Sequence, residues 1–270
     1  LNHAATAPLS RPVREALEAR IEARQDAAIN DYPSFQKLVE QTRDRAARLL
    51  GTEAGRVGFV PNTSYGLNLA AAGLEWEPGD RVAVPGCEFP ANVFPYRRLE
   101  DRGVEVDLIP HESGCFTPED IRETLTPRTR LCSVSWVQFL SGFRADLAEI
   151  GSICRERDVL FVVDAIQGLG ALEIDVEAAG IDVLAAGTHK WLMGTQGLGL
   201  LYLRDGLLER LRPPMAGWAH GPIDWDRLFE YELEFRDEVA RYEIGTPNEM
   251  GLTALHAALG LYREAGPARC

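Results

Sequence analysis

Lys190 is the residue whose type and setting most directly suggest chemistry. The sequence contains only two lysines, and the other, Lys37, lies in a helical pattern dotted with arginine and glutamate. Lys190 follows the apolar run 183–186 and precedes Trp191. Because burial disfavours the charged form of an amine, this setting favours a neutral, nucleophilic lysine of the kind that forms a Schiff base. The alternative is a lysine at the end of a strand that extends its ammonium group into solvent.

Three further groups of residues follow predicted strands, where ligands bind in an open α/β sheet. Thr63 and Ser64 open a predicted helix, whose N–H groups and hydroxyls could hold a phosphate or simply cap the helix. Asp164 ends the apolar run 160–163 and could hold a pyridinium nitrogen, cap a loop or pair with an arginine. Phe89 could stack on a flat cofactor or belong to the core.

Taken in order along the chain, these residues resemble the class V aminotransferase family. That family has the fold-type I pyridoxal-phosphate architecture and includes the cysteine desulfurases. The chain opens with Leu1-Asn-His-Ala-Ala-Thr, which is similar to the family's Leu-Asp-Asn-Ala-Ala-Thr. The further matching segments are Asn62-Thr-Ser-x-Gly, Glu88-Phe-x-Ala, Asp164-x-x-Gln167, His189-Lys190 and Gly245-Thr-Pro-Asn. The likeness therefore covers nearly the whole chain.

The resemblance implies pyridoxal 5'-phosphate as the cofactor and gives roles to the residues around its ring. Lys190 would form the Schiff base and shuttle protons at the alpha carbon of an amino-acid substrate. Asp164 would pair with the pyridine nitrogen and keep it protonated. Gln167 would hydrogen-bond the 3-hydroxyl oxygen, and Phe89 would stack on the ring.

The resemblance also implies a phosphate site and a partner subunit. The residues implied to hold the phosphate are Thr63, Ser64 and His189. The family's serine three places before the lysine is replaced by Gly187, and Thr188 is expected to supply the hydroxyl instead. Thr246 resembles the residue that reaches the phosphate of the neighbouring subunit, so a homodimer with shared active sites is implied.

The substrate side departs from the desulfurase pattern. Desulfurases have a histidine where Phe89 stands and usually an asparagine where Trp136 stands. We therefore predict an aminotransferase-like enzyme. The alternatives are a cysteine desulfurase or selenocysteine lyase, an amino-acid epimerase or another lyase, and a non-enzymatic protein with the same fold. The candidate substrate-binding residues are His3, Trp136 and Arg144.

Composition and charge limit the binding partners, metal sites and cellular location that we expect. The formal net charge of -13 argues against binding to nucleic acid or to a membrane surface. No apolar run is long enough for a membrane helix. The five cysteines have no CxxC spacing, and no histidines have metal-ligand spacing. We therefore expect reduced thiols, no metal and a cytoplasmic location.

Alternating strand and helix patterns predict an α/β fold with an open, mostly parallel sheet covered by helices. The resemblance implies a sheet of the seven-stranded type. One of the covering helices is expected over residues 91–100.

Three regions are expected along the chain. Residues 1–30 should form an N-terminal segment and helix, and residues 31–250 the large domain that binds pyridoxal phosphate. Residues 251–270 should start a helix that leads to a small C-terminal domain outside this chain. Both ends are expected to belong to a longer protein, and the family's nucleophilic cysteine and carboxylate-binding arginine would lie beyond residue 270.

Overall fold

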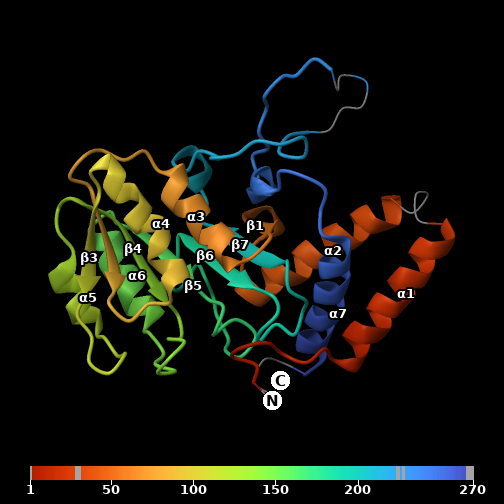
Figure 1. The fold of residues 1–270 in the computed structure, drawn as a ribbon, viewed down its shortest axis with the longest axis horizontal. Helices are drawn as coiled ribbons and strands as arrows, with labels where there is room; N and C mark the ends of the chain where they lie inside the picture. The colour runs from red at the N-terminus through yellow and green to blue at the C-terminus, as the bar shows by residue number, and fades with distance from the viewer. Residues whose placement is uncertain (1, 28–31, 223–225, 227–228, 266–270) are drawn as a thin grey trace.

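A seven-stranded sheet forms the centre of the molecule (Figure 1). The computed structural model describes residues 2–27, 32–222, 226 and 229–265. The strands follow the order β1-β7-β6-β5-β4-β2-β3 across the sheet. Their bounds are β1 Val57–Val60, β2 Arg81–Pro85, β3 Glu105–Ile109, β4 Thr129–Ser135, β5 Leu160–Asp164, β6 Val183–Gly187 and β7 Gly199–Leu203.

The sheet is mostly parallel, as predicted. All neighbouring strands from β6 to β3 pair in parallel, whereas β7 pairs antiparallel with both β6 and β1. Parallel pairing brings the carboxyl ends of β2, β4, β5 and β6 to one edge of the sheet. That edge is where open α/β sheets bind ligands, so it defines where the candidate site must lie.

Helices cover both faces of the sheet. Their bounds are α1 Arg11–Ala27, α2 Tyr32–Leu50, α3 Thr63–Gly73, α4 Phe94–Arg97, α5 Pro118–Thr124, α6 Leu147–Glu156 and α7 Glu249–Ala265. Successive strand residues point to opposite faces. Phe161 and Val163 of β5 therefore pack with α2, α6 and α7, whereas Val162 packs with α3 and α4. Burial on both faces explains why this strand is almost wholly apolar.

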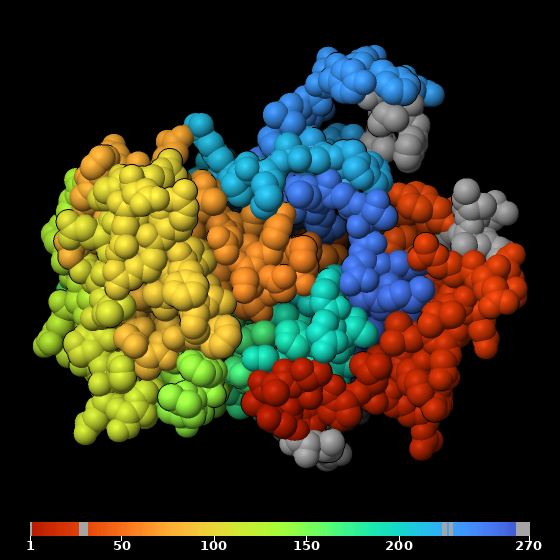
Figure 2. All heavy atoms as spheres, viewed as in Figure 1, coloured from red at the N-terminus to blue at the C-terminus, as the bar shows by residue number. Residues whose placement is uncertain are grey.

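The first and last helices pack together beside the sheet (Figure 1). Val13 of α1 is completely buried against Ala254 and Ala258 of α7. Helix α7 also packs on α2, where Thr42 Oγ1 lies 3.0 Å from His256 Nδ1. The segment that precedes α1 then reaches the carboxyl edge of the sheet. Figure 2 shows this segment (dark red) on the molecular surface beside the residues around position 190 (teal).

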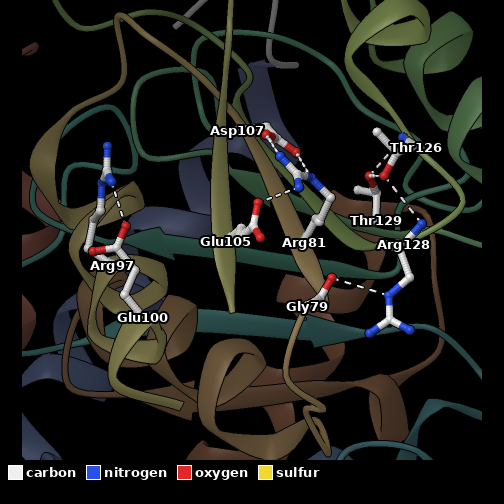
Figure 3. Close-up of polar contacts among 9 residues, drawn as sticks. All are labelled: Gly79, Arg81, Arg97, Glu100, Glu105, Asp107, Thr126, Arg128 and Thr129. Atoms are coloured by element: carbon white, nitrogen blue, oxygen red, sulfur yellow. Dashed lines mark hydrogen bonds and ion pairs between the residues drawn. The ribbon is translucent and has the colours of Figure 1, made fainter. Parts of the chain in front are cut away.

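Polar contacts fix the opposite, amino edge of the sheet (Figure 3). Arg81 at the start of β2 stands in register with Glu105 of β3 and binds the carboxylates of Glu105 and Asp107. Arg128 Nε donates to the carbonyl oxygen of Gly79 at 3.2 Å. These contacts hold the register of β2 and β3, and so fix the relative positions of their carboxyl ends.

The single helix expected over residues 91–100 is wrong. This segment forms a 3-10 turn at Pro90–Asn92, then α4, then a second 3-10 turn at Arg98–Arg102. Pro95 lacks the N–H group that a continuous helix would use to bond the carbonyl four residues earlier, and its ring clashes with that carbonyl. The chain therefore breaks into short turns.

The described helices can be compared with two other expectations, the absence of a membrane helix and the division of the chain into three regions. None of them is both long and apolar enough to cross a membrane. Helix α7 begins at Glu249, beside the boundary expected at residue 250, and packs against both α1 and α2. The division into residues 1–30, 31–250 and 251–270 stays a prediction.

Gly66 sets how closely α3 approaches the sheet. A Cβ atom at Gly66 would lie 2.7 Å from Ala185 Cβ on β6, so Gly66→Ala must displace the helix. We expect G66A to lower the free energy of unfolding by about 1–3 kcal/mol in urea denaturation. The control is Gly245→Ala, because a Cβ at Gly245 meets open space. That variant should change the free energy by less than about 0.5 kcal/mol. Equal stability of the two variants would contradict the packing argument.

Candidate active site

Asp164 ends β5 at the carboxyl edge of the sheet and is only 3% exposed. Burial raises its pKa to about 7. A hydrogen bond of 3.0 Å from the N–H of Ile166 to Oδ1 opposes that rise, nearby Glu88 adds to it, and Lys190 opposes it. The ion pairs formed among the described residues do not include Asp164. A buried carboxylate without a direct cation partner is costly, so this position favours a positively charged ligand.

Lys190 lies three residues beyond the end of β6 and is half-buried. Burial lowers the pKa of Lys190, and the negative charge of Asp164 only partly offsets this. Within the part of the chain that the structure describes, Nζ makes no hydrogen bond or ion pair. Lys190 is therefore a partly desolvated amine near a buried carboxylate, with its nitrogen free to react.

His189 fills space that a side chain at residue 187 would need. A Cβ at Gly187 would lie 3.1 Å from His189 Cε1 and 3.3 Å from Ile166 Cδ1. Burial lowers the pKa of His189, and the charge of Lys190 lowers it further. The imidazole is thus kept neutral at neutral pH, and it can donate or accept one hydrogen bond at each nitrogen.

The N-terminus of α3 opens toward the same edge of the sheet. Asn62 caps the helix by accepting a hydrogen bond of 2.8 Å from the N–H of Tyr65. Thr63 Oγ1 accepts a bond of 2.8 Å from the N–H of Gly187, which fastens α3 to the end of β6. The hydroxyl proton of Thr63 remains available to a ligand, and Ser64 is exposed. This helix end can hold an anion such as a phosphate.

Phe89 presents an uncovered aromatic ring. It is 47% exposed, and its ring meets that of Phe139 edge to face, with centroids 5.2 Å apart and planes at 76°. The core position that the sequence left open for Phe89 is therefore wrong. An exposed flat ring beside a ligand-binding edge can stack on a planar ligand.

The segment before α1 lies against one side of the site and is held there by Gln167. Gln167 Nε2 donates to the carbonyl oxygen of Ala4 at 3.0 Å, and Gln167 Oε1 accepts from Trp191 Nε1 at 3.0 Å. His3 stacks on Trp191, with ring centroids 5.4 Å apart. One N–H of the Gln167 amide remains free for a ligand oxygen. This N–H is the donor that Gln167 could still offer to a cofactor.

Two expected site residues face away from this edge. The Thr188 hydroxyl donates to the carbonyl oxygen of Thr195 at 2.8 Å and is completely buried, so the expectation that it binds the cofactor is wrong. Trp136 is 2% exposed and packs on Gly168, so its expected contact with substrate is wrong as well. Both errors have the same cause. Alternating strand geometry points Ser135 and Gly187 toward the site and the residue after each one to the opposite face.

Arg144 and Thr246 both lie on the surface. Arg144 shares a hollow with Trp136, Glu173 and Asp175, and neither Lys190 nor Asp164 lines it. The structure therefore does not bring Arg144 to the lysine. Thr246 lies in a different hollow, which Tyr65 of α3 also lines. Its expected reach into a neighbouring subunit stays a prediction.

Glu88 is a buried polar residue of this edge that the sequence analysis gave no role. It is 8% exposed and accepts a hydrogen bond of 2.7 Å from Gln138 Nε2. A signal similar to the one for Asp164, a carboxylate close to the end of an apolar strand, could have found it, since Glu88 lies three residues after β2.

These groups fit pyridoxal phosphate. The helix N-terminus suits a phosphate, the ring of Phe89 suits a flat heterocycle, and the buried Asp164 suits a protonated ring nitrogen. Lys190 supplies the amine that a cofactor aldehyde requires. No group of His, Cys, Asp and Glu among the described residues could hold a metal ion.

The raised pKa of Asp164 predicts that the stability of the cofactor-free chain depends on pH. Without cofactor, the folded chain keeps this proton up to about pH 7, whereas the unfolded chain loses it near the ordinary pKa of 3.8. Stability should therefore fall as pH rises from about 4 to about 7. We expect Asp164→Asn to raise the free energy of unfolding at pH 8 by about 2–4 kcal/mol and to leave it nearly unchanged at pH 4. Urea denaturation at both pH values measures this. The same change at both pH values would refute it.

The chain matches the family described as "Aminotransferase class-V" over residues 1–269. A curated relative named "Probable cysteine desulfurase", from Methanothermobacter thermautotrophicus, is 33% identical over 231 residues. That match covers 85% of this chain and 57% of the relative, so the chain spans little more than half of that protein.

Solved structures share the fold. The apo cysteine desulfurase of Thermococcus onnurineus NA1 superposes with a TM-score of 0.88 at 26% identity, covering 98% of this chain and 67% of that one. A mutant of C-DES with glycine covalently linked to its PLP cofactor superposes with a TM-score of 0.91 at 24% identity, covering 98% of this chain and 71% of that one. At this identity, the similarity to C-DES is evidence for the fold alone. With a sequence match over nearly every residue, the chain belongs to the class V aminotransferase family of pyridoxal-phosphate-dependent enzymes.

Proposed function

We propose that this chain forms the cofactor-binding part of an enzyme that uses pyridoxal 5'-phosphate to act at the alpha carbon of an amino acid. The reaction we propose is an amino transfer. One observation carries the proposal: a half-buried lysine without a hydrogen-bond partner lies near a buried carboxylate that lacks a cation. Family membership supports the same cofactor.

The residues around the ring would act as follows. Lys190 Nζ attaches the cofactor covalently, and Asp164 holds the ring nitrogen in its protonated form. Phe89 stacks on the ring, and Gln167 uses its free N–H toward the ring oxygen. The contact between Gln167 and Ala4 supports this role, because it holds the amide in one orientation.

The phosphate would bind at the N-terminus of α3. Ser64, the Thr63 hydroxyl and the neutral His189 are the proposed donors there. His3 is proposed to face the substrate, because its ring stacks on Trp191, the residue that follows Lys190 in the sequence.

When bound, pyridoxal phosphate withdraws electrons from the alpha carbon of an attached amino acid. The protein then has to move a proton at that carbon. Lys190 can do this, since its lowered pKa makes the neutral amine accessible as a base. The buried Asp164 favours the proton on the ring nitrogen, which keeps the ring electron-withdrawing.

A cysteine desulfurase or selenocysteine lyase is the second candidate, because the relative that shares 33% identity carries a desulfurase name. Phe89 is the residue that favours amino transfer over it, since a phenyl ring cannot transfer protons as an imidazole can. An epimerase or another lyase, and a non-enzymatic protein that binds the cofactor, are the remaining alternatives.

Lys190→Ala tests the proposal directly. On addition of pyridoxal phosphate, the purified chain should develop a visible absorption band at longer wavelength than that of the free cofactor. K190A should not develop this band, because the shift requires the covalent bond to the amine. Lys37→Ala is the matched control, since it removes the only other lysine, which is exposed, and should keep the band. The proposal fails if the wild-type chain shows no band or if K190A shows an equal one.

The product then identifies the reaction. A keto acid formed together with transfer of the amino group to an acceptor supports amino transfer. Sulfide from cysteine supports the desulfurase, and an inverted amino acid supports the epimerase. Cofactor binding without turnover of any amino acid leaves the non-enzymatic alternative.

We also propose a homodimer in which Thr246 of one subunit contributes to the phosphate site of the other. Thr246 is exposed in a hollow that Tyr65 of α3 also lines. Sedimentation equilibrium should give twice the chain mass of 29.8 kDa. Thr246→Ala should weaken binding of the cofactor by about tenfold, the loss expected for one hydrogen bond to a charged group. A monomer that binds cofactor with full affinity would refute the shared site.

A cytoplasmic location is proposed from the thiols. Among the described residues, Cys87, Cys115, Cys132 and Cys154 are free thiols, as expected in a reducing compartment. Recovery of the protein in a secreted or periplasmic fraction of its source cells would contradict this.

A further inference from the structure

Glu88 is a second carboxylate buried at the same edge of the sheet as Asp164. It follows β2 and is 8% exposed. Its oxygens accept hydrogen bonds from the N–H of Ser135 at 2.6 Å, from Ser135 Oγ at 2.5 Å and from Gln138 Nε2 at 2.7 Å. Burial raises the pKa of Glu88, and these hydrogen bonds oppose that rise because donors favour the ionised carboxylate.

The hydrogen bonds bring Glu88 to the strand next to Asp164. Ser135 and Asp164 stand opposite each other in the register of β4 and β5, and their side chains point to the same face. The N–H of Trp136 also donates to the carbonyl oxygen of Asp164 at 2.9 Å. Glu88, bonded to the end of β4, and Asp164, at the end of the neighbouring β5, therefore lie at the same edge of the sheet, where Asp164 would meet the pyridine nitrogen.

Little positive charge balances this pair. The negative charge of Glu88 helps to raise the pKa of Asp164, after burial, while the charge of Lys190 lowers it. Burial raises the pKa of the Cys87 thiol and the Tyr96 hydroxyl, and a hydrogen bond with Cys154 raises that of the Cys132 thiol; the charge of Glu88 adds to each rise. Lys190 is the one cation among these neighbours, and among the described ion pairs none includes Glu88.

We propose that Glu88 is a positioning residue that, together with Asp164, holds the positive charge of the cofactor ring. Its charge makes the site more negative without touching the ring, so that a protonated pyridine is favoured more strongly than Asp164 alone would allow. Glu88 precedes Phe89 directly, and Asn92, three residues after Phe89, accepts a hydrogen bond from Ser133 Oγ at 2.5 Å. The same anchors thus fix the loop that carries the stacking ring. The inference rests on the proposed function.

Glu88→Gln separates the charge from the position. Glutamine keeps the shape, and its Oε1 can accept the bonds from Ser135 and Gln138, while its Nε2 can donate to the Ser135 hydroxyl. With pyridoxal phosphate bound, the pH midpoint of the visible absorbance change should fall by about one unit in E88Q, which is the effect expected of one nearby charge. Affinity for the cofactor should fall by about tenfold.

Two further variants serve as a weaker test of the same effect and as a control. Ser135→Ala removes one donor to Glu88 and should lower the same midpoint by a smaller amount, because Glu88 is then more easily protonated. Asp80→Asn removes a buried carboxylate at the opposite end of β2, and should not move it. The inference is overturned if E88Q keeps the wild-type midpoint, or if D80N shifts it equally. If E88Q does not fold, an unchanged midpoint in S135A overturns it.

A cofactor-free measurement separates this inference from the proposed function. The pH dependence of the stability difference between wild type and D164N reports the midpoint at which Asp164 ionises. That midpoint should lie lower by about one unit when the same pair is compared in the E88Q background. An unchanged midpoint overturns the inference. If the chain binds no cofactor, the proposed function fails, and this comparison still decides whether Glu88 acts on Asp164.

Discussion

The site depends on a buried negative charge that the protein itself leaves without a direct partner. Asp164 and Glu88 are 3% and 8% exposed, and hydrogen bonds from Ile166, Ser135 and Gln138 recover only part of the cost of desolvating them. Lys190 could neutralise one charge, but its own burial favours the neutral amine. A cationic ring would balance the charge and leave that amine free. Cofactor binding and cofactor chemistry therefore follow from the same electrostatic arrangement.

The sheet creates this arrangement by geometry. Parallel pairing brings the ends of β2, β4, β5 and β6 to one edge, and the alternation along each strand selects which side chains face α3. The polar network of Arg81, Glu105 and Asp107 secures the opposite edge. The N-terminus of α3 can lie at this edge because Gly66 allows the helix to pack close to Ala185. Each element thus contributes one part of a single ligand site.

Much of the fold and the centre of the site could be predicted from the sequence. Apolar strands that end in polar residues are a local pattern, so Asp164 and Lys190 could be found, and family motifs supplied Phe89 and Gln167. Thr188 and Trp136 face away from the site because the alternation along β6 and β4 continues one residue past the end of each strand. The bonds from Glu88 to Ser135 and from Gln167 to Ala4 join residues far apart in sequence, and no local pattern encodes them.

We propose that Lys190 bonds covalently to the cofactor beside these buried carboxylates. The most direct test of this bond is to load the chain with pyridoxal phosphate, reduce it with borohydride and map the modified peptide by mass spectrometry. The two lysines of the sequence make the result unambiguous. We expect the reduced cofactor on the peptide that contains Lys190 and none on the peptide that contains Lys37. Label on Lys37 alone, or no label on either peptide, would contradict it.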